Sequence, residues 1–132
     1  MDVTKSRLLM IRTLKSNVVP SIKKLGFSGN FPHFRKKKSD RFEFISFQFS
    51  RYGGKFVAEC GFTKVSDLLP FEKEAGFEKL NHGNARSRLR IGAVGVNEEY
   101  WFEYEKFENE AQFEKLAQSI NRLLPQAEMF LK

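Results

Sequence analysis

The chain has 132 residues, which is the size of one domain. Hydrophobic residues make up 41% and charged residues 30%, a mixture that is typical of a globular chain and excludes a disordered one. The net charge of +7 favours anionic partners, such as acidic proteins and nucleic acids. Most of this charge lies in residues 1–64, which hold 14 of the 23 lysines and arginines but only 4 of the 16 acidic residues.

A single cysteine, Cys60, excludes an internal disulfide and a cysteine-rich zinc site, and it is typical of a reducing compartment. No apolar run approaches the ~18 residues that a membrane span needs. Residues 1–15 contain one short apolar run followed by basic residues, which indicates an amphipathic helix rather than a signal peptide. We therefore expect a cytoplasmic protein with no membrane contact.

The first predicted element is a helix that ends at Gly26. Its apolar residues recur at spacings of three and four, which places them on one stripe of a helix: Leu8, Ile11, Leu14, Val18, Ile22 and Leu25. Pro20 falls within this pattern, yet the apolar phase continues past it. We therefore expect a kink or a restarted turn at Pro20 rather than a break.

Two β-hairpins are predicted after this helix. Residues 33–49 predict the first, with its turn near residues 39–40, and residues 50–62 predict the second, with glycines 53–54 in its turn. The phenylalanines change parity within this region, from positions 42 and 44 to positions 47 and 49. A bulge, or a strand covered on both faces, would explain the change. Pro70 and Gly76 interrupt residues 65–83, so we expect this segment to be irregular.

Residues 84–92 place Arg86, Arg88 and Arg90 at every second position, so a strand would direct all three to one face. In residues 99–106, the aromatic residues Tyr100, Phe102 and Tyr104 alternate with Trp101, Glu103 and Glu105. We predict that the two segments form an antiparallel hairpin. The register of this hairpin pairs Arg90 with Glu103 and Arg88 with Glu105. Such pairs contribute only ~0.2–1 kcal/mol each, so their main role would be to fix the register.

Arg86 has no acidic partner in this register, because it would lie opposite Phe107. It is therefore the best candidate among the three arginines for contact with a ligand. The last element is a helix with Asn109 as its N-cap and Gln112 three residues later, and its apolar stripe reaches Ala127 with a kink expected at Pro125.

Several short motifs resemble the family named domain of unknown function 4304. They span most of the chain and comprise Lys23 to Phe27, Phe34-Arg35, Phe47 to Ser50, Phe56 to Gly61, Arg88 to Gly92, and Trp101. The family has no established activity, so the resemblance implies no reaction. Similar small domains act as immunity proteins beside bacterial toxins, which makes that role one expectation for this chain.

Signals for catalysis are weak. His33 and His82 are the only histidines, and neither has a neighbour in sequence that would form a triad, a Cys-His pair or a metal site. We expect His82 to be a solvated loop residue and Cys60 to be a core residue. No catalytic residue, metal or cofactor is predicted.

The first predicted hairpin is strongly basic, with Arg35, Lys36, Lys37 and Lys38 in its first strand. Such a cluster can neutralise the phosphates of a nucleic acid. It can also protect the edge of a sheet from pairing with other chains. The sequence leaves both interpretations open.

Together the patterns predict one α+β domain over residues 1–132, with an N-terminal helix, an antiparallel sheet of about five strands and a C-terminal helix, both helices lying on one face of the sheet. The favoured function is a non-catalytic binding protein that engages an acidic protein, as an immunity-type protein would. The alternatives are a nucleic-acid-binding protein that uses the basic hairpin, and an enzyme that acts on an anionic small molecule. The candidate binding residues are Arg86, Trp101, Arg88, Arg90, Arg35, Lys36, Lys37 and Lys38.

Overall fold

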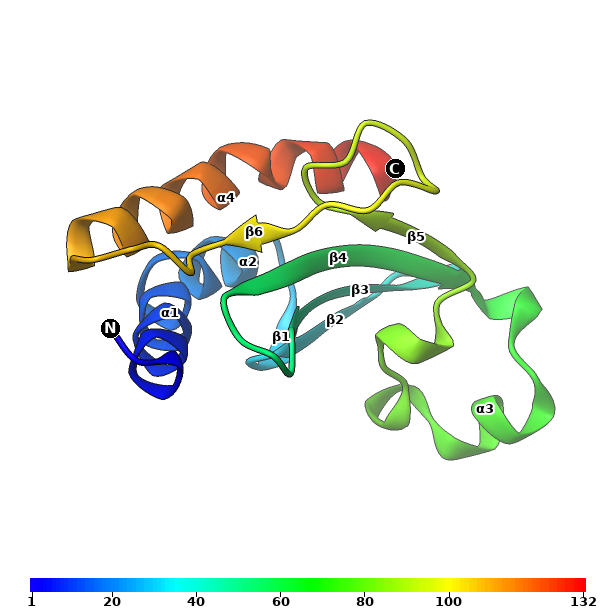
Figure 1. Cartoon of the computed structure of the whole chain (residues 1–132). Coiled ribbons are helices and arrows are strands. Elements are labelled where there is room, and N and C mark those ends of the chain that lie inside the picture. The colour runs from blue at the N-terminus through cyan, green and yellow to red at the C-terminus, as the bar shows by residue number, and fades with distance from the viewer.

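Helices cover one face of an antiparallel sheet in the computed structural model, which describes the whole chain, residues 1–132 (Figure 1). The helices are α1 (Val3–Asn17), α2 (Val19–Lys24), α3 (Pro70–Ala75) and α4 (Glu110–Phe130). The strands are β1 (Ser28–Asn30), β2 (His33–Lys37), β3 (Arg41–Phe49), β4 (Lys55–Lys64), β5 (Ser87–Arg90) and β6 (Phe102–Glu103). The predicted α+β class is confirmed, with its N-terminal helix, antiparallel sheet and C-terminal helix.

The strands follow the order β1-β2-β3-β4-β5, and β6 also pairs with β4. Both predicted hairpins are confirmed: β2 pairs with β3 and β3 pairs with β4, each antiparallel. Gly53 and Gly54 connect β3 to β4 with φ angles of 83° and 81°, a left-handed conformation that other residues rarely adopt. The sequence Tyr-Gly-Gly therefore fixes the turn that brings the two longest strands together.

The predicted N-terminal helix is divided into α1 and α2, and Pro20 lies in the first turn of α2, where the helix restarts. This agrees with the prediction of a restarted turn, since proline is well suited to the start of a helix. Every fourth residue from Met10 to Ile22 is fully buried against the sheet: Met10, Leu14, Val18 and Ile22. Leu8, which was predicted to lie on this stripe, is 62% exposed, and Met10 takes its place in the core.

The C-terminal helix α4 begins as predicted. The Asn109 side chain accepts a hydrogen bond from the Gln112 amide, and the Gln112 side chain accepts from the Asn109 amide. The helix continues through Pro125 as one element. Its buried stripe packs on α1 and on the inner face of the sheet, and it consists of Phe113, Ala117, Ile120, Leu124 and Ala127. None of the helices is both long enough and apolar enough to cross a membrane.

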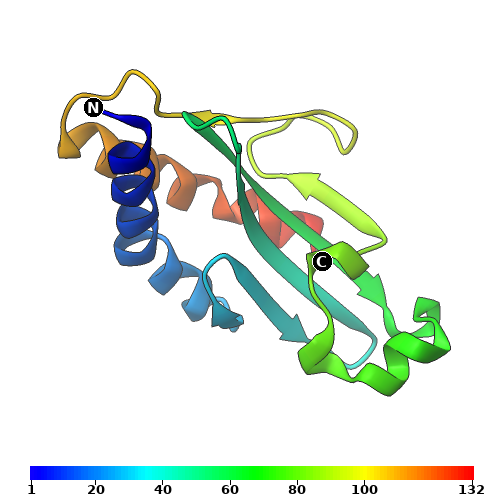
Figure 2. The same cartoon turned by 60° about the horizontal axis from the view of Figure 1, so that its bottom comes forward.

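The parity change in β3 arises because this strand is covered on both faces. Its register with β4 is constant from Arg41 to Phe49, so no bulge is present. Phe47 belongs to the main core beneath the helices, whereas Phe42 and Phe44 belong to a second cluster on the outer face. The second cluster is closed by residues from the segment 65–86, namely Leu68, Leu80 and Ala85. Figure 2 shows this green segment at the end of the sheet opposite α1.

The predicted hairpin between residues 86–93 and 99–106 is wrong. Both segments pair with β4 instead: Leu89 of β5 lies opposite Cys60, and Phe102 of β6 lies opposite Phe56. The ten-residue strand β4 offers one long edge, and β5 and β6 cover its two ends in the same chain direction (Figure 1). The intervening loop, residues 91–101, leaves the sheet between them.

The start of this loop is held by α4. The Gly92 amide donates to the side-chain oxygen of Gln126 at 2.6 Å, and the Gln126 amide group donates to the Ala93 carbonyl at 2.6 Å. Gly92 has a φ of 100°, and a Cβ atom there would lie 2.6 Å from the Tyr100 ring. Glycine is therefore required where β5 ends.

Candidate functional site

The strand that carries the arginines places two of them on the outer face of the sheet, the face away from α1 and α4. There they meet residues of β4 and the residue just before β6. We name this group the arginine cluster, and it consists of Lys55, Glu59, Arg88, Arg90 and Trp101. All five side chains come from β4 or from the segments that pair with it.

Two arginines of the cluster share one carboxylate. Arg88 Nη1 lies 3.8 Å from Glu59 Oε1, and Arg90 Nε lies 3.8 Å from Glu59 Oε2. Both distances exceed that of a good charge-assisted hydrogen bond. Arg88 instead donates hydrogen bonds to the Ala85 and Gly83 carbonyls, at 3.2 Å and 3.0 Å, while Arg90 Nη1 is buried and has no hydrogen-bond partner. The cluster therefore places two arginines against one carboxylate on the outer face.

Trp101 is the aromatic centre of the arginine cluster. Lys55 Nζ lies 4.5 Å from the ring centroid, and Arg90 Cζ lies 5.5 Å from it. Both distances are typical of cation–π contacts, which hold the ring and the two cations in one arrangement. Trp101 is half-buried. The predicted partners of the arginines, Glu103 and Glu105, pair with neither Arg88 nor Arg90, because β6 pairs with β4 and Glu103 lies opposite Lys55.

Arg86 is not unpaired, contrary to the prediction. Its guanidinium group donates to both carboxylate oxygens of Glu72, at 2.6 Å and 3.3 Å. Glu72 is only 3% exposed, and it also accepts hydrogen bonds from the Leu69 amide and the Asn84 side chain. The bidentate pair connects α3 to the start of β5. Glu72 was missed because it lies fourteen positions before Arg86, and the largely irregular backbone between them gives no periodic signal that would link the two residues.

These contacts hold the pKa of Glu72 at about 2, well below its usual 4.5, chiefly through the hydrogen bonds from Arg86 and then through that from the Leu69 amide. A carboxyl group whose pKa is lowered by folding stabilises the fold above its unfolded pKa. That stabilisation is lost as the pH falls toward the folded pKa. The relevant window is therefore about pH 4.5 down to about pH 2.

We expect the variant Glu72→Gln to show faster hydrogen exchange in residues 65–86 than the original chain at pH 7, because an uncharged amide cannot hold Arg86 as a bidentate ion pair. The difference between the two proteins is expected to shrink below pH 4.5 as Glu72 itself becomes protonated. Urea denaturation at several pH values provides the same comparison for the whole fold. The exposed variant Glu74→Gln is the control, and equal behaviour of the two variants would contradict the prediction.

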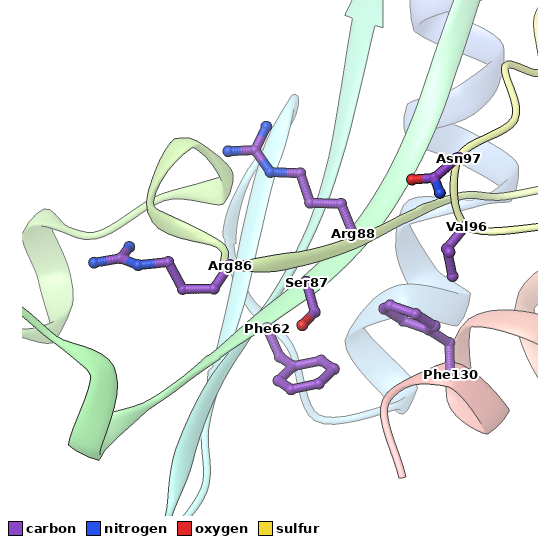
Figure 3. Close-up of a pocket in the computed structure, with 7 residues that line it drawn as sticks. All are labelled: Phe62, Arg86, Ser87, Arg88, Val96, Asn97 and Phe130. Atoms are coloured by element: carbon purple, nitrogen blue, oxygen red, sulfur yellow. The ribbon is translucent and has the colours of Figure 1, made fainter.

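An open groove of about 560 Å³ runs along the free edge of β5 (Figure 3). The Ile91 amide donates to the Ala58 carbonyl, and hydrogen-bonded residues alternate in an antiparallel pair, so the main-chain groups of Arg88 and Arg90 point away from β4. An exposed strand edge of this kind can accept another extended chain. Apolar and cationic side chains line the groove: Phe62, Arg86, Ser87, Arg88, Val96, Asn97 and Phe130.

The basic hairpin is largely bound to its own fold. Lys36 Nζ donates to the Leu25 carbonyl at the end of α2, at 2.8 Å. Lys38 Nζ lies 3.1 Å from the carboxylate of Glu43, which is 2% exposed. Arg35 lies over the Phe77 ring, with 5.8 Å between the guanidinium carbon and the ring centroid. Lys37 is exposed, and its ammonium group makes no ion pair or hydrogen bond.

The two histidines lie together. His33 at the start of β2 and His82 of the 3-10 turn His82–Asn84 stack with 5.1 Å between ring centroids and 13° between their planes. Burial lowers the pKa of His82, and the neighbouring His33 adds to this effect. Because the two residues are far apart in the sequence, no local pattern could predict the pair. His82 is half-buried rather than the solvated loop residue that was expected.

Cys60 is a core residue as predicted. It is 1% exposed, and burial raises the pKa of its thiol to about 12, so it is a neutral thiol at physiological pH. No group of three or more histidine, cysteine, aspartate or glutamate residues is arranged to hold a metal ion.

Comparison with known protein families matches residues 18–130 to a family described as a domain of unknown function (DUF4304). The matched range includes α2, the whole sheet and all of α4, together with every residue of the arginine cluster. No curated protein and no solved structure matches the chain.

Proposed function

We propose that this chain, which belongs to the family described as a domain of unknown function, DUF4304, is a non-catalytic protein that binds an acidic partner protein through the arginine cluster. The observation that carries the proposal is the charge balance around Trp101. Lys55 and Arg90 lie over this half-buried ring, and Arg90 shares the carboxylate of Glu59 with Arg88.

Tryptophan and arginine are the residues that most often dominate the binding energy of protein interfaces. Here the cation–π contacts hold them in place before a partner arrives, which reduces the entropy lost on binding. A carboxylate of the partner could accept hydrogen bonds from the solvent-accessible parts of the Arg88 and Arg90 side chains, which are 42% and 25% exposed. An acidic surface therefore fits the cluster better than a neutral one.

The free edge of β5 supports the same location. An extended segment of the partner could pair with the main chain of Arg88 while its side chains enter the neighbouring groove. Val94, in the loop after β5, is 94% exposed and offers an apolar contact beside the groove. Main-chain pairing would supply affinity, and the arginines would supply selectivity for acidic sequences.

An immunity-type protein, which binds a toxin and blocks it, is one form of this proposed function. We also place the protein in the cytoplasm, because its one cysteine is a buried free thiol. The nucleic-acid alternative has less support, since Arg35, Lys36 and Lys38 already have intramolecular partners. The enzyme alternative has less support because Arg86 is engaged with Glu72, and the carboxylate beside Arg88 and Arg90, that of Glu59, is paired with both of them.

The test is capture of partners by the tagged protein from a lysate of its native cells, with and without nuclease, followed by quantitative mass spectrometry. We expect one acidic protein in near-stoichiometric amount, unaffected by nuclease. The variant Trp101→Ala should then weaken its binding by roughly thirtyfold or more, as loss of a hot-spot residue does. The variant Arg88→Gln/Arg90→Gln should weaken it as well, and more so at low salt.

A matched control removes the same charge from the exposed side of α4, with Lys115→Gln/Arg122→Gln. This variant should bind the partner as the original chain does. Equal losses in both double variants would show that only the net charge matters, which contradicts the proposal. Recovery of nucleic acid alone, removed by nuclease, would favour the basic hairpin instead.

A further inference from the structure

A second cleft, of about 540 Å³, lies beside α1 at the end of β3, and no residue of the arginine cluster lines it. We name it the histidine cleft, because the stacked pair of His33 and His82 forms part of its wall. Ten residues line it, and none of them is an aspartate or a glutamate. The basic side chains among them are Arg7, Lys15, His33 and His82.

The cations of the cleft come from one stripe of α1. Arg7, Ile11 and Lys15 follow one another at intervals of four, so their side chains lie on the same side of the helix. Neither Arg7 nor Lys15 is in a salt bridge with a carboxylate of the chain. Two permanent positive charges therefore face the same cleft without a counter-charge, an arrangement that attracts an anion.

The rest of the wall is aromatic. Phe31 and Phe47 stack with 5.2 Å between their centroids, and Phe49 contacts Phe31 edge to face at 6.4 Å. Arg7 lies over the Phe49 ring at 5.5 Å, and Lys15 lies over the Phe31 ring at 5.9 Å. The cations are thus placed at the rim of an apolar surface. A ligand that fits both parts has a negative group joined to an apolar body.

The histidine pair adds a ring nitrogen that the fold leaves unpaired. His82 Nδ1 is buried and has no hydrogen-bond partner, a state that costs free energy unless a ligand or water pairs with it. Burial and the neighbouring His33 lower the pKa of His82, Glu59 opposes this effect, and Arg88 adds to it. An anion in the cleft would favour the protonated form of the imidazole.

We propose that the histidine cleft binds a small organic carboxylate with an apolar or aromatic body. The carboxylate lies between Arg7, Lys15 and the histidine pair, and the apolar body packs on Phe31 and Phe49. None of the residues that line this cleft belongs to the arginine cluster, so the proposal can be tested separately from binding of the partner protein.

The experiment uses phenylacetate as the probe and follows the imidazole signals by two-dimensional NMR. The chain has only two histidines, so the spectrum contains one signal from each, and the variant His33→Gln assigns them. We expect saturable shifts of both signals on titration with phenylacetate. The bound state should show a higher pKa for His82 than the free state, and the affinity should rise from pH 7.5 to pH 5.5 because protonation is favoured by the anion.

Two comparison probes separate the parts of the proposal. Phenylacetamide keeps the ring and removes the charge, and inorganic phosphate keeps the charge and removes the ring. Both should bind at least about tenfold more weakly than phenylacetate. Equal binding of phenylacetamide would overturn the role of the cations, and equal binding of phosphate would overturn the role of the aromatic wall.

The variant Arg7→Gln/Lys15→Gln should weaken phenylacetate binding about tenfold, since each removes a charged donor. The control Lys115→Gln/Arg122→Gln removes the same charge elsewhere and should leave the affinity unchanged. If the double variant does not fold, Lys15→Gln alone is sufficient, because Lys15 is an exposed residue. No shift of either histidine signal at probe concentrations up to about 10 mM, well above a millimolar Kd, would overturn the proposal.

Discussion

The variant Phe56→Ala is expected to lower the free energy of unfolding by about 3–5 kcal/mol, a large part of the ~5–15 kcal/mol that stabilises a typical domain. Phe56 is fully buried at the centre of the aromatic core. Its ring stacks on Phe49 with 4.9 Å between centroids and on Phe102 with 5.3 Å. The truncation would leave a cavity at the start of β4 and remove the contact that holds β6.

Urea denaturation followed by circular dichroism measures this loss. The control is Tyr52→Ala in the turn between β3 and β4, where the side chain is 79% exposed and its removal should change the free energy of unfolding by less than about 0.5 kcal/mol. A loss below about 1 kcal/mol for Phe56→Ala would mean that the core can collapse around the cavity, contrary to the packing described above.

The variant Phe44→Ala is expected to act locally. Phe44 is 1% exposed and belongs to the second cluster on the outer face, where it packs with Leu68, Leu80 and Ala85. Its truncation should cost about 3 kcal/mol or more at this small cluster. Because the main core lies on the other face of β3, we expect the segment 65–86 to open before the rest of the sheet does.

Hydrogen exchange resolved by peptide distinguishes this local opening from global unfolding. The matched control is Phe47→Ala, on the same strand but facing the main core. It should increase exchange throughout the sheet and the helices, whereas Phe44→Ala should increase it mainly in residues 65–86. Identical exchange patterns in the two variants would show that the two clusters form one cooperative unit, which contradicts the expectation.

Much of the fold could be predicted from the sequence because its elements carry local signals. The restarted helix at Pro20, the glycine turn at positions 53–54 and the N-cap at Asn109 each depend on residues close in the chain, and all three are confirmed. The change of phenylalanine parity in β3 left two explanations open, a bulge or cover on both faces, and the structure shows the second. The segment that covers the outer face of β3 could not be identified from the sequence, because the apolar residues of 65–86 do not recur with a regular period.

The candidate site was harder to predict because it depends on contacts between distant segments. Alternation correctly placed Arg88 and Arg90 on the outer face and Leu89 in the core. However, alternation gives the direction of a side chain and not the identity of the neighbouring strand. Glu59 and Glu103 satisfy the pattern equally well, and only the three-dimensional pairing selects Glu59.

The loop of residues 91–101 has a consequence for how this chain can vary. Both of its ends are attached to the same strand, through Leu89 at one end and Phe102 at the other, and Gln126 holds its first turn. Its length can therefore change without shifting the register of either pairing, and loop closure entropy rises only slowly with length. The loop is a natural insertion point, where a reporter peptide or an altered recognition sequence could be added beside the arginine cluster while the sheet remains intact.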